Sequence, residues 1–101
     1  MLDPRRTADV VRAVLLVTLE RESSRHHDAF QRRLLAFPEV QQIYDVAGDW
    51  DYVVVLATTS MARHDELATR LFKDAPNVQR YTTMFVLKPV RVGSYVPTRR
   101  L

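Results

Sequence analysis

Two matching stretches, AFPEVQQ at residues 36–42 and DAPNVQR at residues 74–80, decide how this chain folds. In both, a proline stands two residues before a valine that is followed by glutamine, and the stretches lie 38 residues apart. The same offset pairs Val17 with Val55, His26 with His64 and Arg32 with Arg70. Such sparse identity gains weight because the order of hydrophobic periodicities is repeated as well. The sequence therefore predicts two copies of one structural unit.

In the first copy, residues 13–20 are aliphatic and β-branched, which is typical of a strand. Ser23 or Ser24 can then cap a helix, because a serine oxygen accepts from the free N–H groups of the first turn. Pro38 ends that helix, and residues 40–47 form the second predicted strand. One helical face carries His27, Phe30, Leu34 and Phe37.

The second copy follows the same plan, with strands at residues 52–58 and 78–87, a cap at Ser60 and a stop at Pro76. Its helical stripe consists of His64, Leu67, Ala68, Leu71, Phe72 and Ala75. Two strand–helix–strand units joined by a short connection at residues 48–51 make a βαββαβ chain. Right-handed crossovers then predict an α+β, ferredoxin-like fold whose antiparallel sheet carries both helices on one face.

The strands are apolar on both faces, although a sheet covered on one side only should alternate apolar and polar residues. In the first strand Leu15 and Val17 point one way while Val14 and Leu16 point the other way, and the third and fourth strands behave alike. Exposing such side chains would forgo about 1.5–3 kcal/mol each. We therefore predict a homodimer joined sheet to sheet, as in a dimeric α/β barrel, that can build a larger assembly.

Composition limits the remaining classes of protein. The chain has no cysteine, which excludes disulfides and thiolate metal sites, and no apolar run approaches the about 20 residues of a membrane helix. The N-terminus lacks the features of a signal peptide, so we expect a cytoplasmic protein without membrane contact. The net charge of +3 comes from the tails, since residues 13–87 hold eight basic and ten acidic residues. A DNA-reading face on the body is therefore not expected.

Residues 48–52, GDWDY, are the most informative segment for function. Glycine and aspartate suit a hairpin turn, which explains the segment in part. In addition, the carboxylates of Asp49 and Asp51 can bind an ammonium group, and loop N–H groups can hold a carboxylate. Together they complement an amino-acid zwitterion. Thr82 and Thr83 add hydroxyls in the last strand, although threonine is also simply a good strand former.

Catalytic and cofactor chemistry find little support. His26, His27 and His64 are all predicted on helices, and adjacent histidines on a helix diverge too far to chelate one ion. We interpret His27 and His64 as packing or capping residues. With only Gly48 and Gly93 there is no phosphate-binding glycine loop, so no cofactor, metal or catalytic residue is predicted.

The chain resembles the effector domain, known as RAM, of the Lrp/AsnC family of transcription regulators. The residues that carry the resemblance are 38–40 (PEV), 46–52 (VAGDWDY), 76–78 (PNV), 82–83 (TT) and 86–88 (VLK). It extends from about residue 2 to residue 88. We divide the chain into an N-terminal connector at residues 1–11, an effector-binding and oligomerisation domain at 12–90 and a C-terminal tail at 91–101.

The resemblance implies sheet-to-sheet dimers that assemble further, often as octamers, and amino-acid effectors bound between dimers near the hairpin. Asp51 is the expected ammonium contact, and the effector site that it implies consists of Gly48, Asp49, Trp50, Asp51, Thr82 and Thr83. Members usually begin with a helix-turn-helix, which is absent here, so we expect DNA contact only through such a part. Two alternatives remain: an enzyme of the dimeric α/β-barrel type, with a histidine or carboxylate facing the barrel interior, and a purely structural oligomerisation module.

Overall fold

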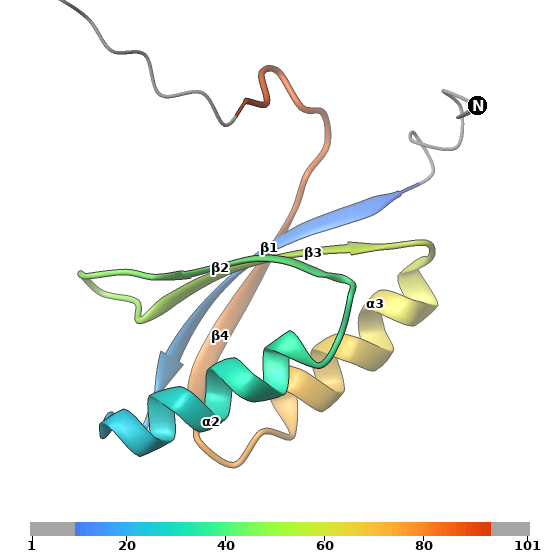
Figure 1. The fold of residues 1–101 in the computed structure, drawn as a ribbon. Helices are drawn as coiled ribbons and strands as arrows, with labels where there is room; N and C mark the ends of the chain where they lie inside the picture. Colours follow the sequence, from blue (N-terminus) through green and yellow to red (C-terminus); the bar gives the residue numbers. More distant parts are fainter. Residues whose placement is uncertain (1–9, 94–101) are drawn as a thin grey trace, which may run out of the picture.

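The computed structural model describes residues 10–93 and confirms the βαββαβ order (Figure 1). The elements are β1 (Val11–Leu19), α2 (Ser24–Leu35), β2 (Val40–Asp45), β3 (Tyr52–Thr58), α3 (Met61–Ala68), the π-helical turn η1 (Thr69–Lys73) and β4 (Val78–Phe85). The strands are antiparallel and lie in the order β2-β3-β1-β4, so the two strand–helix–strand units interleave in one sheet.

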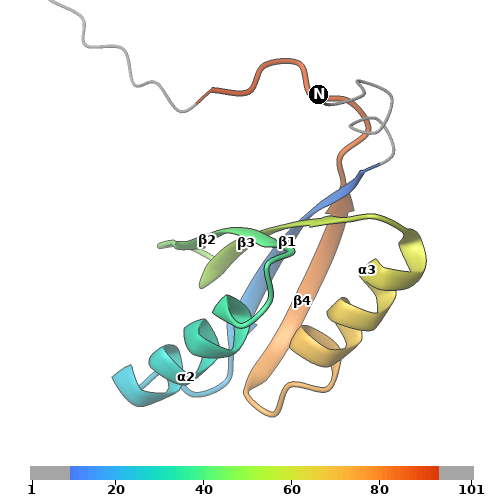
Figure 2. The same cartoon turned by 45° about the vertical axis from the view of Figure 1, so that its right-hand side comes forward.

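Both helices cover the same face of the sheet, as predicted (Figures 1 and 2). In the register, Leu15 of β1 lies opposite Val54 of β3 and Thr83 of β4, so these three side chains share the helix-covered face. The buried apolar core consists of Ala13, Leu15, Val17, Leu19, Phe30, Leu34, Tyr52, Val54, Leu56, Leu67, Ala68, Leu71 and Phe72. The predicted helical stripes therefore supply one side of the core and alternate strand residues supply the other.

The helix starts agree with the sequence prediction, whereas the end of α2 does not. Ser23 caps α2 by accepting from His26 N at 3.4 Å, and Ser60 caps α3 by accepting from Arg63 N at 3.0 Å. The first helix ends at Leu35, two residues earlier than predicted. Because Pro38 disfavours a helical backbone in the preceding residue, Phe37 leaves the helix and its N–H bonds Leu34 O in a tight turn at 3.2 Å.

The second helix widens in its last turn, which the sequence did not reveal. The N–H of Asp74 donates to Thr69 O at 2.8 Å, five residues back, so the turn is π-helical. Leu71 and Phe72 are both almost fully buried within this turn. The extra residue thus brings two neighbouring large side chains into the core.

Two strands are shorter than predicted. β2 ends at Asp45 rather than at residue 47, and the bond from Val46 N to Asp51 O at 2.9 Å closes the hairpin. β4 ends at Phe85 rather than at residue 87, because β1 offers one last acceptor, Arg12 O, which takes the N–H of Val86 at 2.9 Å. In each case the residue that follows the strand still makes one backbone bond to the neighbouring segment.

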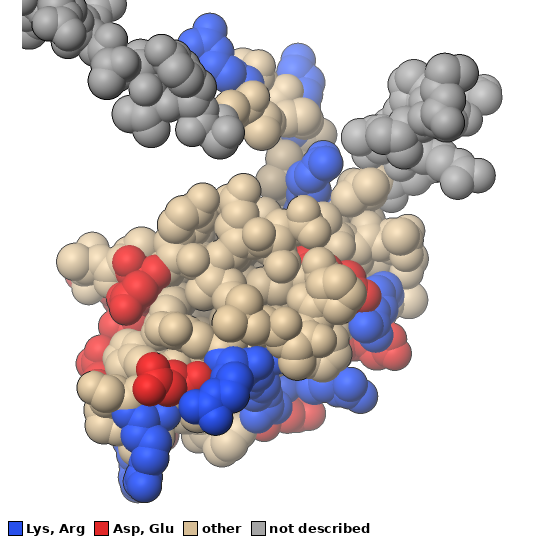
Figure 3. Space-filling model, in the orientation of Figure 1, with Lys and Arg blue, Asp and Glu red and all other residues tan. Residues whose placement is uncertain are grey.

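The face of the sheet that points away from the helices, here called the outer face, is largely apolar. Its apolar residues are Val14, Leu16, Tyr44, Val53, Val55, Ala57 and Met84, as the strand register requires. Tyr44 and Met84 are 52% and 49% exposed, and the other five are half-buried. Among residues 10–93, no element covers this face (Figure 1). The register also places the polar residues Arg12, Gln42, Arg80 and Thr82 on this face. Many of the other charged side chains lie along the helices and at the β2–β3 hairpin (Figure 3).

The described part of the chain contains no helix that is both long and apolar enough to cross a membrane. The connector predicted at residues 1–11 lies almost entirely outside the described residues, as does most of the tail predicted at 91–101.

Candidate functional site

The β2–β3 hairpin, residues 46–51, bends at Gly48, whose φ of +134° is accessible to glycine but strained for other residues. The hairpin is tied to its neighbours through the backbone of Asp51. Its N–H donates to Val17 O at 2.9 Å, and its carbonyl accepts from Val46 N at the same distance. The loop is therefore held at the end of β1, while Asp49 at its tip is exposed.

The side chain of Asp51 is bonded to the backbone of β1. Its Oδ2 accepts from Leu19 N at 2.8 Å, where β1 passes beyond its pairing with β3 and is irregular against β4. A carboxylate that accepts from a backbone N–H makes a charge-assisted bond, which is stronger than a neutral one. Asp51 thus holds the end of β1, a structural role that the sequence did not indicate.

Trp50 is brought next to Arg80 of β4. The guanidinium carbon of Arg80 lies 4.3 Å from the centre of the Trp50 ring, which is a cation–π contact. Arg80 pairs with Thr18 across the sheet. Arg80 was not among the residues predicted for the site, although it is the single charged residue of β4.

The two candidate threonines lie on opposite faces of β4. Thr82 pairs with Leu16, is exposed and shares the outer face with Arg80 two residues earlier. Thr83 pairs with Leu15, is half-buried and points toward the helices. The structure therefore brings Thr82, but not Thr83, to the side of the sheet where Trp50 and Arg80 meet.

Behind the hairpin, Tyr52 anchors the start of β3 to α2. Its hydroxyl oxygen lies 2.6 Å from Nδ1 of His27 and accepts from Nε2 of Gln31 at 2.9 Å. Burial of the ring raises the pKa of Tyr52 above its ordinary value, so the hydroxyl stays protonated. Nε2 of His27 lies 3.9 Å from Glu22. The prediction that His27 packs against the core is confirmed.

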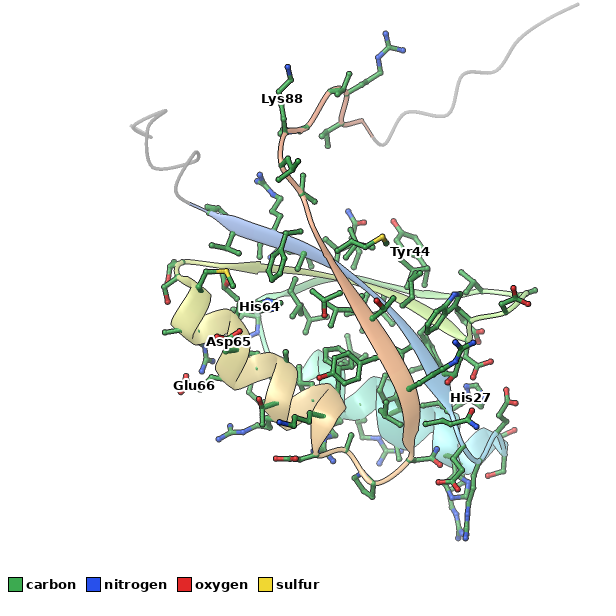
Figure 4. The ribbon with its side chains drawn as sticks, turned by 180° about the vertical axis from the view of Figure 1, so that it is seen from behind. His27, Tyr44, His64, Asp65, Glu66 and Lys88 are labelled. Carbon is green, nitrogen blue, oxygen red and sulfur yellow. The ribbon has the colours of Figure 1, made fainter. Side chains whose placement is uncertain are left out.

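The other two histidines also belong to the helix side of the sheet, where Figure 4 labels His27 and His64. His64 is 3% exposed, packs its ring against Phe85 with centroids 4.9 Å apart, and leaves Nδ1 without a hydrogen bond. His26 Nδ1 lies 2.6 Å from Ser23 Oγ at the helix start. None of the three therefore faces the outer side, where the enzyme alternative would place a histidine or a carboxylate.

A groove of about 430 Å³ lies away from the hairpin, between α2 and the segment that precedes β4. Its wall is held by Asn77, whose Oδ1 accepts from Arg21 N and whose Nδ2 donates to Arg21 O, both at 2.8 Å. Its lining includes Glu20, Arg21, Phe30, Arg33, Asn77 and Val78. Within residues 10–93, no three histidine or acidic side chains are grouped closely enough to hold a metal ion.

Residues 12–96 match the family described as "Lrp/AsnC ligand binding domain", over most of the chain. The chain belongs to the Lrp/AsnC family. This Lrp/AsnC chain is 26% identical to the DNA-binding transcriptional activator DecR of Escherichia coli over 97 residues, which is 96% of this chain and 64% of DecR. It therefore spans somewhat less than two thirds of that relative. It is 25% identical to the Bkd operon transcriptional regulator of Pseudomonas aeruginosa over 96 residues, 95% of this chain and 63% of that protein.

Two solved structures have the same fold. The regulator NMB0573 of Neisseria meningitidis, solved in complex with L-methionine, superposes with a TM-score of 0.81 at 22% identity, covering 96% of this chain and 62% of its own. FFRP-DM1 superposes with a TM-score of 0.67 at 28% identity, covering 76% of this chain and 99% of its own. The ferredoxin-like prediction and the family resemblance are both confirmed.

Proposed function

We propose that this Lrp/AsnC domain senses an α-amino acid, which binds at the β2–β3 hairpin. The observation that carries the proposal is the meeting of opposite charges there. Asp49 and Asp51 flank Trp50, and the guanidinium of Arg80 stacks on that indole at 4.3 Å. An amino-acid zwitterion has one cationic and one anionic group, so it can pair with both kinds of side chain. The NMB0573 complex with L-methionine supports this class of ligand.

Within this site, Asp51 is the proposed ammonium contact. Its Oδ2 is already bonded to Leu19 N, so the ammonium would bind the second oxygen of a carboxylate whose position is set by β1. Arg80 would hold the carboxylate together with loop N–H groups near Gly48. The exposed hydroxyl of Thr82 lies on the same face as Arg80 and is available for an uncharged polar contact.

We further propose that two copies of the chain pair through their outer faces. Valine and leucine side chains on that face lack a cover among residues 10–93, and Tyr44 and Met84 extend the same apolar surface. A contiguous apolar surface of this kind favours association in water. Pairing of identical sheets about a two-fold axis would cover both at once. Assembly of such dimers into octamers is the larger state that we expect from the family.

The proposed role of the ligand is to change the assembly, and through it the control of transcription by the full regulator. A ligand shifts an equilibrium between two assemblies only when it binds one of them more tightly. A hairpin at the end of the sheet can lie at contacts between dimers, where such a difference arises. DecR and the Bkd regulator act on transcription, which supports this role for the domain. The net charge of −2 over residues 13–87 argues against direct DNA contact by the body.

Titration calorimetry with the common amino acids, combined with light scattering with and without ligand, tests the proposal. We expect at least one amino acid to bind and to change the particle mass. Thr82→Val should weaken binding, whereas the matched variant Thr83→Val should not, because Thr83 points toward the helices. The sensing function is wrong if no common amino acid binds and the mass never changes.

A further inference from the structure

We propose that the groove beside α2 binds a small organic acid, a carboxylate with an apolar body and no ammonium group. The groove measures about 430 Å³ and lies between α2 and residues 74–77, the connection that leads into β4. Figure 2 shows the start of α2 and this connection at the lower end of the molecule. No residue of the β2–β3 hairpin lines the groove, so the inference does not rest on the proposed amino-acid site.

The buried part of the groove lining is apolar. Phe30 of α2 is 5% exposed, and Ala75 and Val78 on the opposite side are half-buried. Ala29 and Pro76 continue this surface toward solvent. Ligand sites are typically cavities of about 300–1,000 Å³ with an apolar lining and a few polar groups that orient the ligand. The groove therefore has the size and the lining that suit a ligand with a hydrocarbon body.

The rim of the groove carries an excess of positive charge. Arg21, which follows β1, and Arg33 of α2 both line it, together with one acidic residue, Glu20. Within residues 10–93, neither arginine is in an ion pair with a carboxylate. A guanidinium group can bind a carboxylate through two parallel hydrogen bonds. Two arginines against one acidic residue favour an anion over a cation or a zwitterion.

The guanidinium of Arg33 is already positioned by the protein. Its Nη2 donates to the carbonyl oxygen of Arg70 at 2.7 Å, which fixes one side of the group. A guanidinium has five N–H donors, so most of them stay available to a ligand. A donor that is held in place loses less conformational entropy when a ligand binds.

The wall opposite α2 is held by three hydrogen bonds to Asn77. The N–H of Glu20 donates to the carbonyl oxygen of Asn77 at 2.9 Å, and the N–H of Arg21 donates to its Oδ1 at 2.8 Å. Asn77 Nδ2 returns a bond to Arg21 O at 2.8 Å. These bonds join the end of β1 to the connection that precedes β4. The groove is therefore a preformed site, which lowers the cost of binding.

Titration calorimetry with butanoate, hexanoate and octanoate tests the inference. Each added methylene group should lower the dissociation constant about fourfold until the groove is filled. Hexylammonium, which has a similar body and the opposite charge, should bind at least about tenfold more weakly than hexanoate. Equal affinity for hexanoate and hexylammonium, or no binding of any of the three acids, would overturn the proposal.

Amide chemical shifts of the ¹⁵N-labelled chain locate the bound acid. We expect the signals of Ala29 and Asn77 to move and to saturate as octanoate is added. The signals of Val53 and Val55 report on the outer face, which is also apolar and attracts hydrocarbon chains. Shifts at Val53 and Val55 without shifts at the groove would show that octanoate binds the outer face, and the proposal would be wrong.

Variants of the rim test the role of charge. Because exposed charge pairs contribute little singly, Arg21→Gln and Arg33→Gln should each raise the dissociation constant of octanoate about threefold, and the double variant about tenfold. Arg32→Gln is the matched control, since Arg32 is an exposed neighbour on α2 that does not line the groove. If the double variant binds octanoate as tightly as Arg32→Gln does, the arginines do not hold the carboxylate and the proposal fails.

A blocking variant tests the groove without changing its charge. Ala29 is exposed on α2, so Ala29→Phe should fill the groove and abolish octanoate binding while the melting temperature stays unchanged. Ala62→Phe makes the same change at an exposed alanine of α3 and should bind octanoate normally. Normal binding by Ala29→Phe would overturn the proposal.

Arg80→Gln separates this inference from the proposed amino-acid site. It should weaken amino-acid binding at the hairpin and leave octanoate binding unchanged. If Arg80→Gln weakens octanoate binding and the groove variants do not, the acid occupies the hairpin and the groove proposal is wrong. If no amino acid binds but octanoate binding depends on Arg21 and Arg33, the sensing proposal fails and the groove proposal stands.

Discussion

Replacing Asp51 should separate two roles that one carboxylate has in this domain. Asp51→Ala removes the bond from Leu19 N to Oδ2 at 2.8 Å, which is a hydrogen bond to a charged group and contributes about 1.5–3 kcal/mol. Each kcal/mol that is lost lowers the melting temperature of a domain of this size by about 4–8 °C, so Asp51→Ala should lower the melting temperature by about 6–24 °C. Urea unfolding at one fixed protein concentration measures the loss, since dimerisation makes stability depend on concentration.

Asp51→Asn is the informative companion variant. The amide oxygen can still accept from Leu19 N, so its free energy of unfolding should lie within about 1 kcal/mol of the unaltered chain. The negative charge is lost, however, and the affinity for the amino acid should fall about tenfold or more in calorimetry. Asp49→Asn, at the exposed loop tip, should leave the unfolding free energy unchanged. If Asp51→Ala melts like the unaltered chain, the structural role is refuted, and if Asp51→Asn binds the ligand normally, the ammonium contact is refuted.

Two further predictions concern ionisable groups of the core and its rim. Tyr52→Phe leaves His27 and Gln31 without their shared partner and should cost about 1–3 kcal/mol in urea unfolding, whereas Tyr44→Phe on the outer face should cost less than about 0.5 kcal/mol. Because burial raises the pKa of Tyr52 in the folded state, the free energy of unfolding should fall as pH rises above about 10. Tyr52→Phe should remove part of that fall. If the free energy of unfolding of Tyr52→Phe depends on alkaline pH just as that of the unaltered chain does, this reasoning is contradicted. Arg63 Nε donates to Glu39 Oε2 at 2.8 Å and lowers the pKa of that carboxyl below its usual 4.5. The stability that this pair contributes is present above pH 4.5 and is lost as pH falls below it. The melting temperature of Glu39→Gln should therefore fall less steeply with acid pH than that of the unaltered chain. Equal slopes of melting temperature against pH would show that the pair contributes nothing.

Much of the fold could be predicted from local sequence because each element carries its own signal. The strand at residues 52–58 and the caps Ser23 and Ser60 agree with the structure. Element ends that depend on a neighbouring strand could not be predicted so well. β4 stops at Phe85 because Arg12 offers the last acceptor of β1, and no pattern within residues 78–87 carries that information.

The candidate site shows the same limit. The hairpin at Gly48 is evident from turn chemistry, and alternation along β4 assigns Thr82 and Thr83 to opposite faces. The register between β1 and β4 decides which of these faces meets Trp50, and it also brings Arg80 beside that ring. The bond from Asp51 to Leu19 joins residues 32 positions apart and depends on the irregular end of β1. Contacts of this kind become visible only once the strands are paired.

The central claim is that a second copy of the chain covers the outer face. Sedimentation velocity at micromolar concentration, on the unaltered chain and on Leu16→Asp, tests it most directly. We predict a dimer or a multiple of it for the unaltered chain, and a folded monomer or a much weaker dimer for the variant, while Leu35→Asp remains assembled. A well-folded monomer of the unaltered chain at micromolar concentration would contradict the claim.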